Sequence, residues 1–235
     1  MAYTLTYSYN GGSQSYSVAG YTGEPVDVVV PDTYDDGVHG EHPVTAIREY
    51  AFRACSSLTS ITIPDSVTII ETMAFDLCGS LTSITIPDSV TDIGERAFSN
   101  CSSLISITIP DSVISIGAAA FYGCNSLTSI NILPKLVPIL GNNVFVQINA
   151  NAKFYCFQSA IDAYKTATNW NTYADKFVAD DVRLYFVMNA NSTKKYVDSA
   201  DALKVNKTTE IAGIQINNGI SANELMNSLF DVEVV

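Results

Sequence analysis

The sequence is poor in basic residues. Twelve lysines and arginines stand against 24 aspartates and glutamates, so the 235 residues carry a formal net charge of −12. Such a charge argues against nucleic acid and anionic membrane surfaces as partners. No apolar run approaches the roughly 18 residues of a membrane-spanning helix, so we expect no membrane insertion. The first ten residues lack the basic and apolar regions of a signal peptide, which leaves the localisation open.

Motifs of catalysis are also missing. The sequence contains no glycine-rich phosphate loop, no nucleophile elbow and no cysteine–histidine cluster with zinc spacing. The only two histidines lie in Asp35–His42, beside three acids, which is a weak metal signal without further ligands. We interpret this segment as a mobile, solvated loop, and we expect no enzyme, no cofactor and no metal site.

An internal repeat dominates what is present. The ten residues Thr59–Thr68 recur unchanged at Thr82–Thr91 and almost unchanged at Ile105–Ile114. A step of 23 residues separates equivalent phenylalanines and equivalent cysteines: Phe52, Phe75, Phe98 and Phe121, and Cys55, Cys78, Cys101 and Cys124. A fixed period of this length, with apolar residues at constant phase, is typical of a stacked solenoid.

Each repeat predicts one strand and a return segment. In the second repeat, Leu81, Ile84 and Ile86 follow the alternation of a short strand, which Pro87 ends because proline lacks an N–H group. Residues from the return segment, such as Val90 and Phe98, then turn inward. One turn cannot cover its own apolar face, so neighbouring turns must stack into a continuous core.

The cysteines fit this ladder better than they fit disulfides. Four of the five occupy one phase of the repeat, where successive side chains stack roughly 4.8 Å apart. A buried free cysteine behaves as a small hydrophobe, so we expect reduced, structural thiols. The fifth, Cys156, falls on what we predict to be the last strand, 152–156.

The repeat phrase resembles the BspA-type leucine-rich repeats of bacterial and protozoan surface proteins. The resemblance covers roughly residues 20–180 and rests on Ile-Pro-Asp-Ser-Val followed by Ile-Gly, Ala-Phe and Cys-Ser-Leu. It implies an α/β repeat solenoid, right-handed, with a parallel sheet on its concave side. It also implies adhesion at a cell surface, since several members are adhesins.

Four segments follow from this organisation. We predict a β-hairpin cap at 1–20, because Asn10-Gly-Gly12 separates two strand-like stretches. The leucine-rich-repeat solenoid spans 21–157, and a helical cap at 158–180 contains a helix over 158–173. A small α+β extension covers 181–235, with strands at 183–187 and 210–214 and helices at 193–205 and 221–229.

Part of the extension, within 193–226, resembles a short domain of phage and prophage tail proteins. It gives an alternative in which the chain belongs to a virion and 181–235 anchors or oligomerises it. The leading prediction is a non-enzymatic module that binds a host or bacterial surface protein or glycan, at a cell surface. The two readings are compatible if a virion carries an adhesin module.

Two rows of polar residues are candidate sites. The outward positions of the predicted concave strands are a wall of short polar side chains: Ser60, Thr62, Ser83, Thr85, Ser106, Thr108, Ser129 and Asn131. They suit contacts to sugar or peptide backbone, although short polar β-formers also keep an exposed sheet soluble.

The second row consists of Asp65, Asp88 and Asp111. Their predicted spacing is close to that of glycosidase carboxylates, but they lie in equivalent environments, which such enzymes avoid. Calcium along the row is an alternative. The simplest interpretation is that each aspartate accepts hydrogen bonds from the turn that follows its proline.

Overall fold

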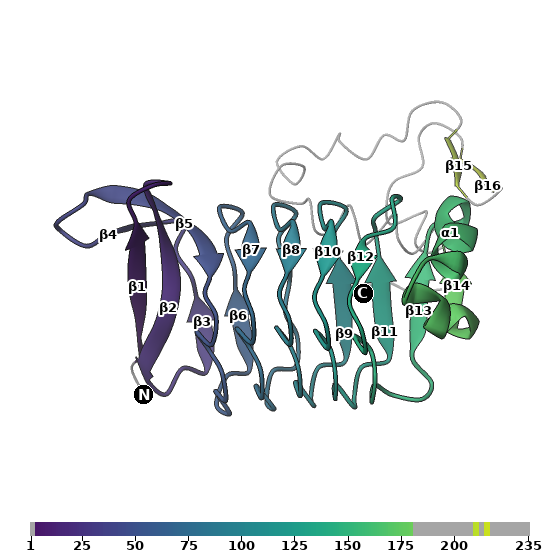
Figure 1. Ribbon diagram of the computed structural model, residues 1–235, viewed down its shortest axis with the longest axis horizontal. Coiled ribbons are helices and arrows are strands. Elements are labelled where there is room, and N and C mark those ends of the chain that lie inside the picture. Colours follow the sequence, from purple (N-terminus) through teal and green to yellow (C-terminus); the bar gives the residue numbers. More distant parts are fainter. Residues whose placement is uncertain (1–2, 181–208, 212–213, 217–235) are drawn as a thin grey trace. The chain divides into compact units, whose positions relative to one another are not determined.

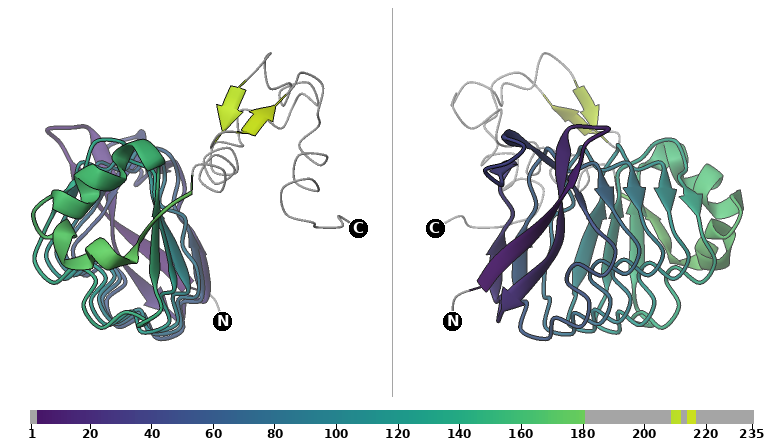
Figure 2. Two further views of the ribbon diagram at one scale, coloured as in Figure 1. Left: turned by 90° about the vertical axis from the view of Figure 1, so that its right-hand side faces the viewer. Right: turned by 60° about the vertical axis from the view of Figure 1, so that its left-hand side comes forward.

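The structure, a computed structural model, describes residues 3–180, 209–211 and 214–216. The chain divides into two compact units, Met1–Ala179 and Asp180–Val235. In the first unit the turns of a coil follow one another along a single axis (Figure 1). Viewed along that axis the turns nearly superimpose, and helical segments cover one end (Figure 2).

The first unit begins with an antiparallel hairpin of β1 (Tyr3–Asn10) and β2 (Ser15–Gly23). The Asn10 side chain closes its turn, because Asn10 Oδ1 accepts a hydrogen bond of 3.0 Å from Gly12 N. Strand β2 also pairs in parallel with β5 (Glu41–Ile47). The hairpin thereby continues a sheet of the coil and covers its first turn with the buried side chains of Tyr16 and Val18.

One sheet runs along the coil on the side of the return segments. Beyond β5 it contains four parallel strands of two residues each: β7 (Ile69–Ile70), β8 (Asp92–Ile93), β10 (Ser115–Ile116) and β12 (Ile139–Leu140). The sequence analysis expected no strand here. A two-residue strand is too short to show alternation, so only the pairing with neighbouring turns reveals it. The extra residues of the first turn form β4 (Thr33–Asp35), antiparallel to β5.

The opposite side carries strands at most of the positions that the sequence predicted, with two differences: residues 81–86 form no strand, and the strand at 177–179 was not expected. The strands are β3 (Asp27–Val29), β6 (Ser60–Thr62), β9 (Ser106–Ile109), β11 (Ser129–Ile132), β13 (Lys153–Cys156) and β14 (Phe177–Ala179). We predicted one parallel sheet, but the structure has two, β3–β6 and β9–β11–β13–β14. Between them Thr82 forms only single backbone bonds to Thr59 and Ile105, of 3.2 and 3.4 Å. Cys156 is not on the last strand, because β14 follows and pairs with β13.

Three short helical segments replace the predicted helix over 158–173. They are the 3₁₀ helix η1 (Gln158–Ala160), α1 (Ile161–Thr166) and the 3₁₀ helix η2 (Trp170–Lys176). Helix α1 ends at Thr166 because Ala167 is extended (φ −68°, ψ 148°), and Asn169, with a φ of 65°, then precedes η2. Within the described residues, no helix is long and apolar enough to span a bilayer.

In the second unit the structure describes one antiparallel pair, β15 (Thr209–Ile211) and β16 (Ile214–Ile216). It replaces the single strand that we predicted over 210–214. The strand at 183–187 and the helices at 193–205 and 221–229 lie outside the described residues.

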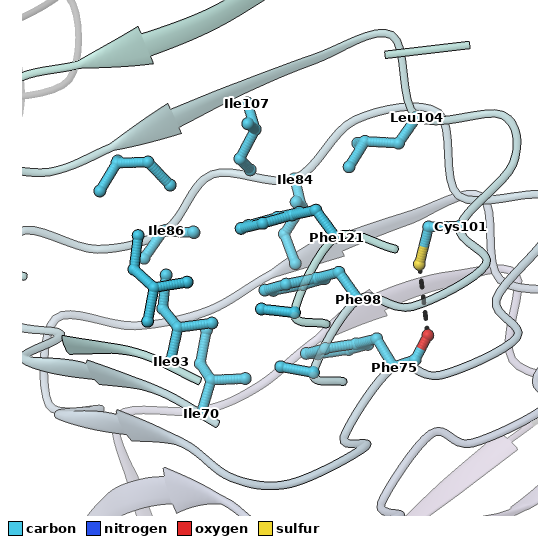
Figure 3. Packing of buried hydrophobic residues seen from close by; sticks show 14 of the residues in the cluster. Ile70, Phe75, Ile84, Ile86, Ile93, Phe98, Cys101, Leu104, Ile107 and Phe121 are labelled. Atoms are coloured by element: carbon cyan, nitrogen blue, oxygen red, sulfur yellow. Dashed lines mark hydrogen bonds between the residues drawn. The ribbon is translucent and has the colours of Figure 1, made fainter. Parts of the chain in front are cut away.

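The core of the coil is a ladder of identical side chains (Figure 3). Phe75 and Phe98 stack with ring centroids 5.2 Å apart and planes 3° from parallel, and Phe98 and Phe121 repeat this separation. The thiols of Cys78, Cys101 and Cys124 each donate to a phenylalanine carbonyl of the turn before, as Cys101 Sγ does to Phe75 O at 3.2 Å. All five cysteines are free and buried, as expected.

Two features of each turn allow the ladder to close. The bend around the Ala-Phe pair places residues in the left-handed region at two phases, for example Met73 (φ 52°) and Leu77 (φ 64°). At a third phase the turns touch backbone to backbone. A Cβ atom on Gly94 would lie 2.5 Å from Glu71 C and Thr72 N.

Gly94→Ala therefore tests the contact between turns. The added methyl meets rigid backbone, and we expect a loss of about 1–3 kcal/mol of unfolding free energy, the usual cost of overpacking. Urea or thermal unfolding followed by circular dichroism measures it.

Gly79→Ala is the matched control, since its new Cβ would lie 3.6 Å from the nearest atom, Ser102 Oγ. We expect stability unchanged, or raised by up to about 1 kcal/mol through the unfolded state. Equal stabilities of the two variants would contradict the close approach at Gly94.

Candidate interaction surface

Most of the hydroxyl wall lies on the outer face of the β3–β6 and β9–β11–β13–β14 sheets, whereas Ser83 and Thr85 lie in the turn between the two sheets, which forms no strand. Alternation along each strand places Ile61, Ile107 and Ile130 in the core, and the serine and threonine side chains on either side of them point outward. The buried isoleucines between the serines and threonines therefore fix the orientation of this outer face.

Four members of the wall are exposed and make no side-chain hydrogen bond within the described part of the chain: Thr62, Ser83, Thr85 and Ser106. Ser60 differs, because its hydroxyl donates a 2.7 Å bond to Asp27 Oδ1. Ser129 is half-buried and also has an interaction. The free hydroxyls are thus confined to the middle turns.

Asn131 does not belong to an exposed wall. It is 7% exposed, and its Nδ2 donates a 3.2 Å bond to Thr108 Oγ1. Its Oδ1 is buried and has no hydrogen-bond partner within the described residues. In strand register Asn131 lies between Thr108 and the larger Tyr155, a neighbour from outside the regular repeats. Asn131 and Thr108 bond to each other and are therefore not among the exposed polar side chains that lack a hydrogen bond.

Strand register adds residues that the sequence analysis missed. The row of outward serines begins at Asp27 on β3 and ends at Lys153 on β13, so it carries opposite charges at its two ends. Hydrogen bonds from Ser60 and Thr59 lower the pKa of Asp27. The phrase Val28-Val-Val and the predicted strand 152–156 already contained the register that identifies Asp27, Lys153 and Tyr155.

The three aspartates form a row, but they do not cap their turns. All three are exposed, and no hydrogen bond to their side chains occurs within residues 3–180. The neighbouring serines take the structural role instead: Ser89 Oγ donates to Val67 O at 2.6 Å and Ser112 Oγ to Val90 O at 2.7 Å. The expectation that each aspartate accepts hydrogen bonds from its own turn is wrong.

The negative charges of the three aspartates repel one another. Partial burial and then the charges of Asp65 and Asp111 raise the pKa of Asp88. No group of three or more histidine, cysteine, aspartate or glutamate side chains in the described residues is placed to hold a metal ion. The calcium alternative therefore has no support from the geometry.

The histidine segment is a structured hairpin rather than a mobile loop. Strands β4 and β5 enclose it, and His39 Nδ1 lies 2.7 Å from Asp36 Oδ2. The His39 ring stacks on Tyr9 with centroids 4.0 Å apart. Hydrogen bonds from the His39 backbone and ring hold the pKa of Asp36 well below its usual range. Contacts with the first hairpin give this segment its order.

The cysteines have the environment of structural thiols. Burial raises the pKa of Cys78 and of Cys124 to about 12. These thiols are therefore protonated at neutral pH, whereas a nucleophile or metal ligand requires the thiolate.

Comparisons with known proteins agree with this architecture. The family described as "BspA type Leucine rich repeat region" matches residues 41–171 in six copies. A leucine-rich repeat protein of T. pallidum is 30% identical, with a TM-score of 0.59; the match covers 67% of this chain and 70% of that one. No curated protein sequence matches the chain.

Two further solved structures are similar. A leucine-rich repeat protein from Bacteroides ovatus is 33% identical, with a TM-score of 0.58, and the match covers 64% of this chain but 39% of that one. For a leucine-rich repeat protein from Bacteroides capillosus the identity is 29%, the TM-score 0.50, and the coverage 55% and 93%. The phage-tail resemblance of 193–226 has no counterpart among these findings.

Two aspartate variants test the electrostatics with opposite signs. The raised pKa of Asp88 means that its protonated form favours folding, so this contribution is complete below the unfolded pKa of about 3.9 and is lost as the pH rises through the folded pKa. Asp88→Asn keeps the neutral form, and we expect a melting temperature about 1–2 °C higher at pH 7 and equal to the parent at pH 3.

Asp27→Asn is the matched control. The lowered pKa of Asp27 stabilises the fold above its unfolded pKa, and this contribution disappears as the pH falls through the folded pKa. We expect this variant to melt below the parent at pH 7 and to converge with it at low pH. Shifts of the same sign in both variants would contradict the assigned environments. Thermal melts over pH 3–8 provide the measurement.

Proposed function

Because the chain belongs to the BspA-type leucine-rich-repeat family, we propose that it is a non-enzymatic binding module. Its ligand is a protein or glycan on a host or bacterial surface, and the contact is made by the middle of the hydroxyl wall. Adhesion at a cell surface is the setting that this ligand class implies.

The free hydroxyls carry this proposal. Thr62, Ser83, Thr85 and Ser106 are exposed on adjacent turns, and no side chain in the described residues uses their hydrogen-bonding capacity. Hydroxyl groups donate and accept, which suits sugar hydroxyls and peptide groups alike. The buried side chains of Ile61, Ile84 and Ile107 fix the backbone beside these residues, so binding requires little ordering of the protein.

The similarity of the turns also favours a binding function over catalysis. The hydroxyl groups lie in equivalent turns, so no one of them has the distinct environment that a catalytic group requires. The alternative of a phage or prophage tail component, and assembly through 181–235, rest on a segment that lies largely outside the described residues. The comparisons add no support to that alternative.

Ser83→Arg combined with Thr85→Arg tests the proposal. Both positions are exposed, so the fold should persist while the long side chains obstruct the centre of the face. Purified protein is applied to an array of host and bacterial glycans and to a panel of extracellular matrix proteins. We expect saturable binding to at least one probe, reduced about tenfold or more in this variant.

The matched control adds two arginines away from the hydroxyl wall, at Ile69 and Leu77, which are exposed hydrophobic residues. It has the same net charge as the test variant and should bind like the parent. Absence of saturable binding on both panels, or equal loss in the control, would contradict the proposed function.

A further inference from the structure

A second surface lies where the chain leaves the hydroxyl wall, beside the last regular turn. A cleft of about 410 Å³ opens there, and its lining combines apolar side chains with one acid and one base: Asp111, Val113, Ile114, Lys135, Leu136, Val137 and Pro138. Leu136 is 88% exposed and Ile114 is 62% exposed. Two large apolar side chains this exposed beside one cleft offer an apolar contact surface to a partner.

The cleft lies at a turn with one inserted residue, and the C-terminal cap fixes both ends of its loop. Phe121 and Phe145 are 24 residues apart instead of 23, so the segment 133–138 contains one inserted residue. Tyr164 Oη donates a 2.7 Å bond to Pro134 O, and Trp170 Nε1 donates a 2.8 Å bond to Pro138 O. Both donors are buried, so the two ends of the loop are fixed while Leu136 projects between them.

The aspartate row leads into this cleft. Asp65, Asp88 and Asp111 occupy the same position in successive turns, and Asp111 is part of the cleft lining. No ion pair neutralises them within the described residues. Lys135 follows the row in sequence, but its Nζ lies 5.4 Å from the centre of the Phe157 ring, where it makes a cation–π contact. The row is therefore a negatively charged surface whose aspartates repel one another and have no positively charged partner within the described residues.

The spacing of the aspartates along the row indicates whether a partner would bind as a helix or as an extended strand. At the phenylalanine stack, successive turns are separated by 5.2 Å, as Phe75, Phe98 and Phe121 show. The aspartates also recur once in each turn, so their row repeats on a similar scale. An α-helix repeats every 5.4 Å, so side chains at i, i+4 and i+7 keep step with three turns of the coil. Alternate side chains of an extended strand are about 6.6 Å apart and lose the match within three turns.

We propose that the aspartate row and the cleft together dock a basic amphipathic helix of a protein partner. Lysine or arginine side chains on one stripe of the helix face Asp65, Asp88 and Asp111. An apolar side chain one turn further along packs against Ile114 and Leu136 in the cleft. This inference rests on the proposed binding function but uses a surface other than the hydroxyl wall.

The test uses the full chain and a helix-forming, alanine-based peptide with lysines at i, i+4 and i+7 and a leucine at i+11. Fluorescence anisotropy measures its dissociation constant at low and moderate salt. We expect saturable binding that weakens with salt. The triple variant Asp65→Asn, Asp88→Asn, Asp111→Asn should weaken it about tenfold and remove most of the salt dependence. Leu136→Ser should weaken it several-fold and leave the salt dependence in place.

The control variant Glu24→Gln, Glu49→Gln, Asp162→Asn removes three exposed acids elsewhere and reaches the same net charge. It should bind the peptide like the parent. A control peptide of identical composition, with its lysines distributed around the helix, should bind at least about tenfold more weakly. Circular dichroism of each variant checks that the fold is intact.

Equal weakening by the two triple variants, equal affinity for the two peptides, or no saturable binding would each overturn the docking site. These failures are separable from failure of the proposed function. If Ser83→Arg with Thr85→Arg still abolishes ligand binding on the panels while the peptide fails to bind, the hydroxyl wall stands and the docking site alone is wrong.

Discussion

The face-to-face stack of phenylalanines sets the register on which the rest of this fold depends. Five rings, from Phe52 to Phe145, stand 5.2–5.4 Å apart with planes within 7° of parallel. A buried ring excludes more solvent than any other residue of the turn, so a shift by one residue would expose one ring and force an aliphatic side chain into its place. The stack ends where Phe154 tilts by 51° against Phe145, and the cap of Tyr164 and Trp170 begins there.

This register decides which polar side chains of each turn bond to the neighbouring turn and which stay on the outside. The serine after each aspartate bonds to the turn before it, and the thiols bond to phenylalanine carbonyls. Of the two candidate rows, the hydroxyls on the middle turns and the three aspartates make no side-chain hydrogen bond within the described residues. The inserted residue between Phe121 and Phe145 leaves this register intact. The stack continues across it with a ring distance of 5.4 Å, so the extra length is displaced to the surface, where it forms the cleft.

The repeat predicted what recurs and missed what depends on a unique neighbour. The phases of Phe98, Cys101 and Ile84 followed from the period alone, because identical turns have identical surroundings. Asn131 looked equivalent to Thr108, yet Tyr155 on the next strand lies outside the repeat and changes its environment. The strands of two residues could not be predicted for another reason: they are defined by hydrogen-bonded pairing with neighbouring turns, and two residues are too few to show an alternating pattern in the sequence. The predicted helix over 158–173 ends at Thr166, because Ala167 is extended and Asn169 has a positive φ.

Deletion of one complete turn tests most directly whether register is what holds the structure together. Removing 23 residues, Thr59–Leu81, joins Leu58 to Thr82, and the ten residues after the junction are identical to those removed. Since each turn contacts mainly its neighbours, we expect a folded chain with cooperative unfolding and four buried thiols instead of five. Removing 25 residues, Thr59–Ser83, leaves Phe52 and Phe98 only 21 positions apart, two short of a full turn, so the rings cannot stack in register and that chain should not fold cooperatively. Circular dichroism melts and thiol labelling of both chains give the answer, and similar behaviour of the two deletions would contradict the account.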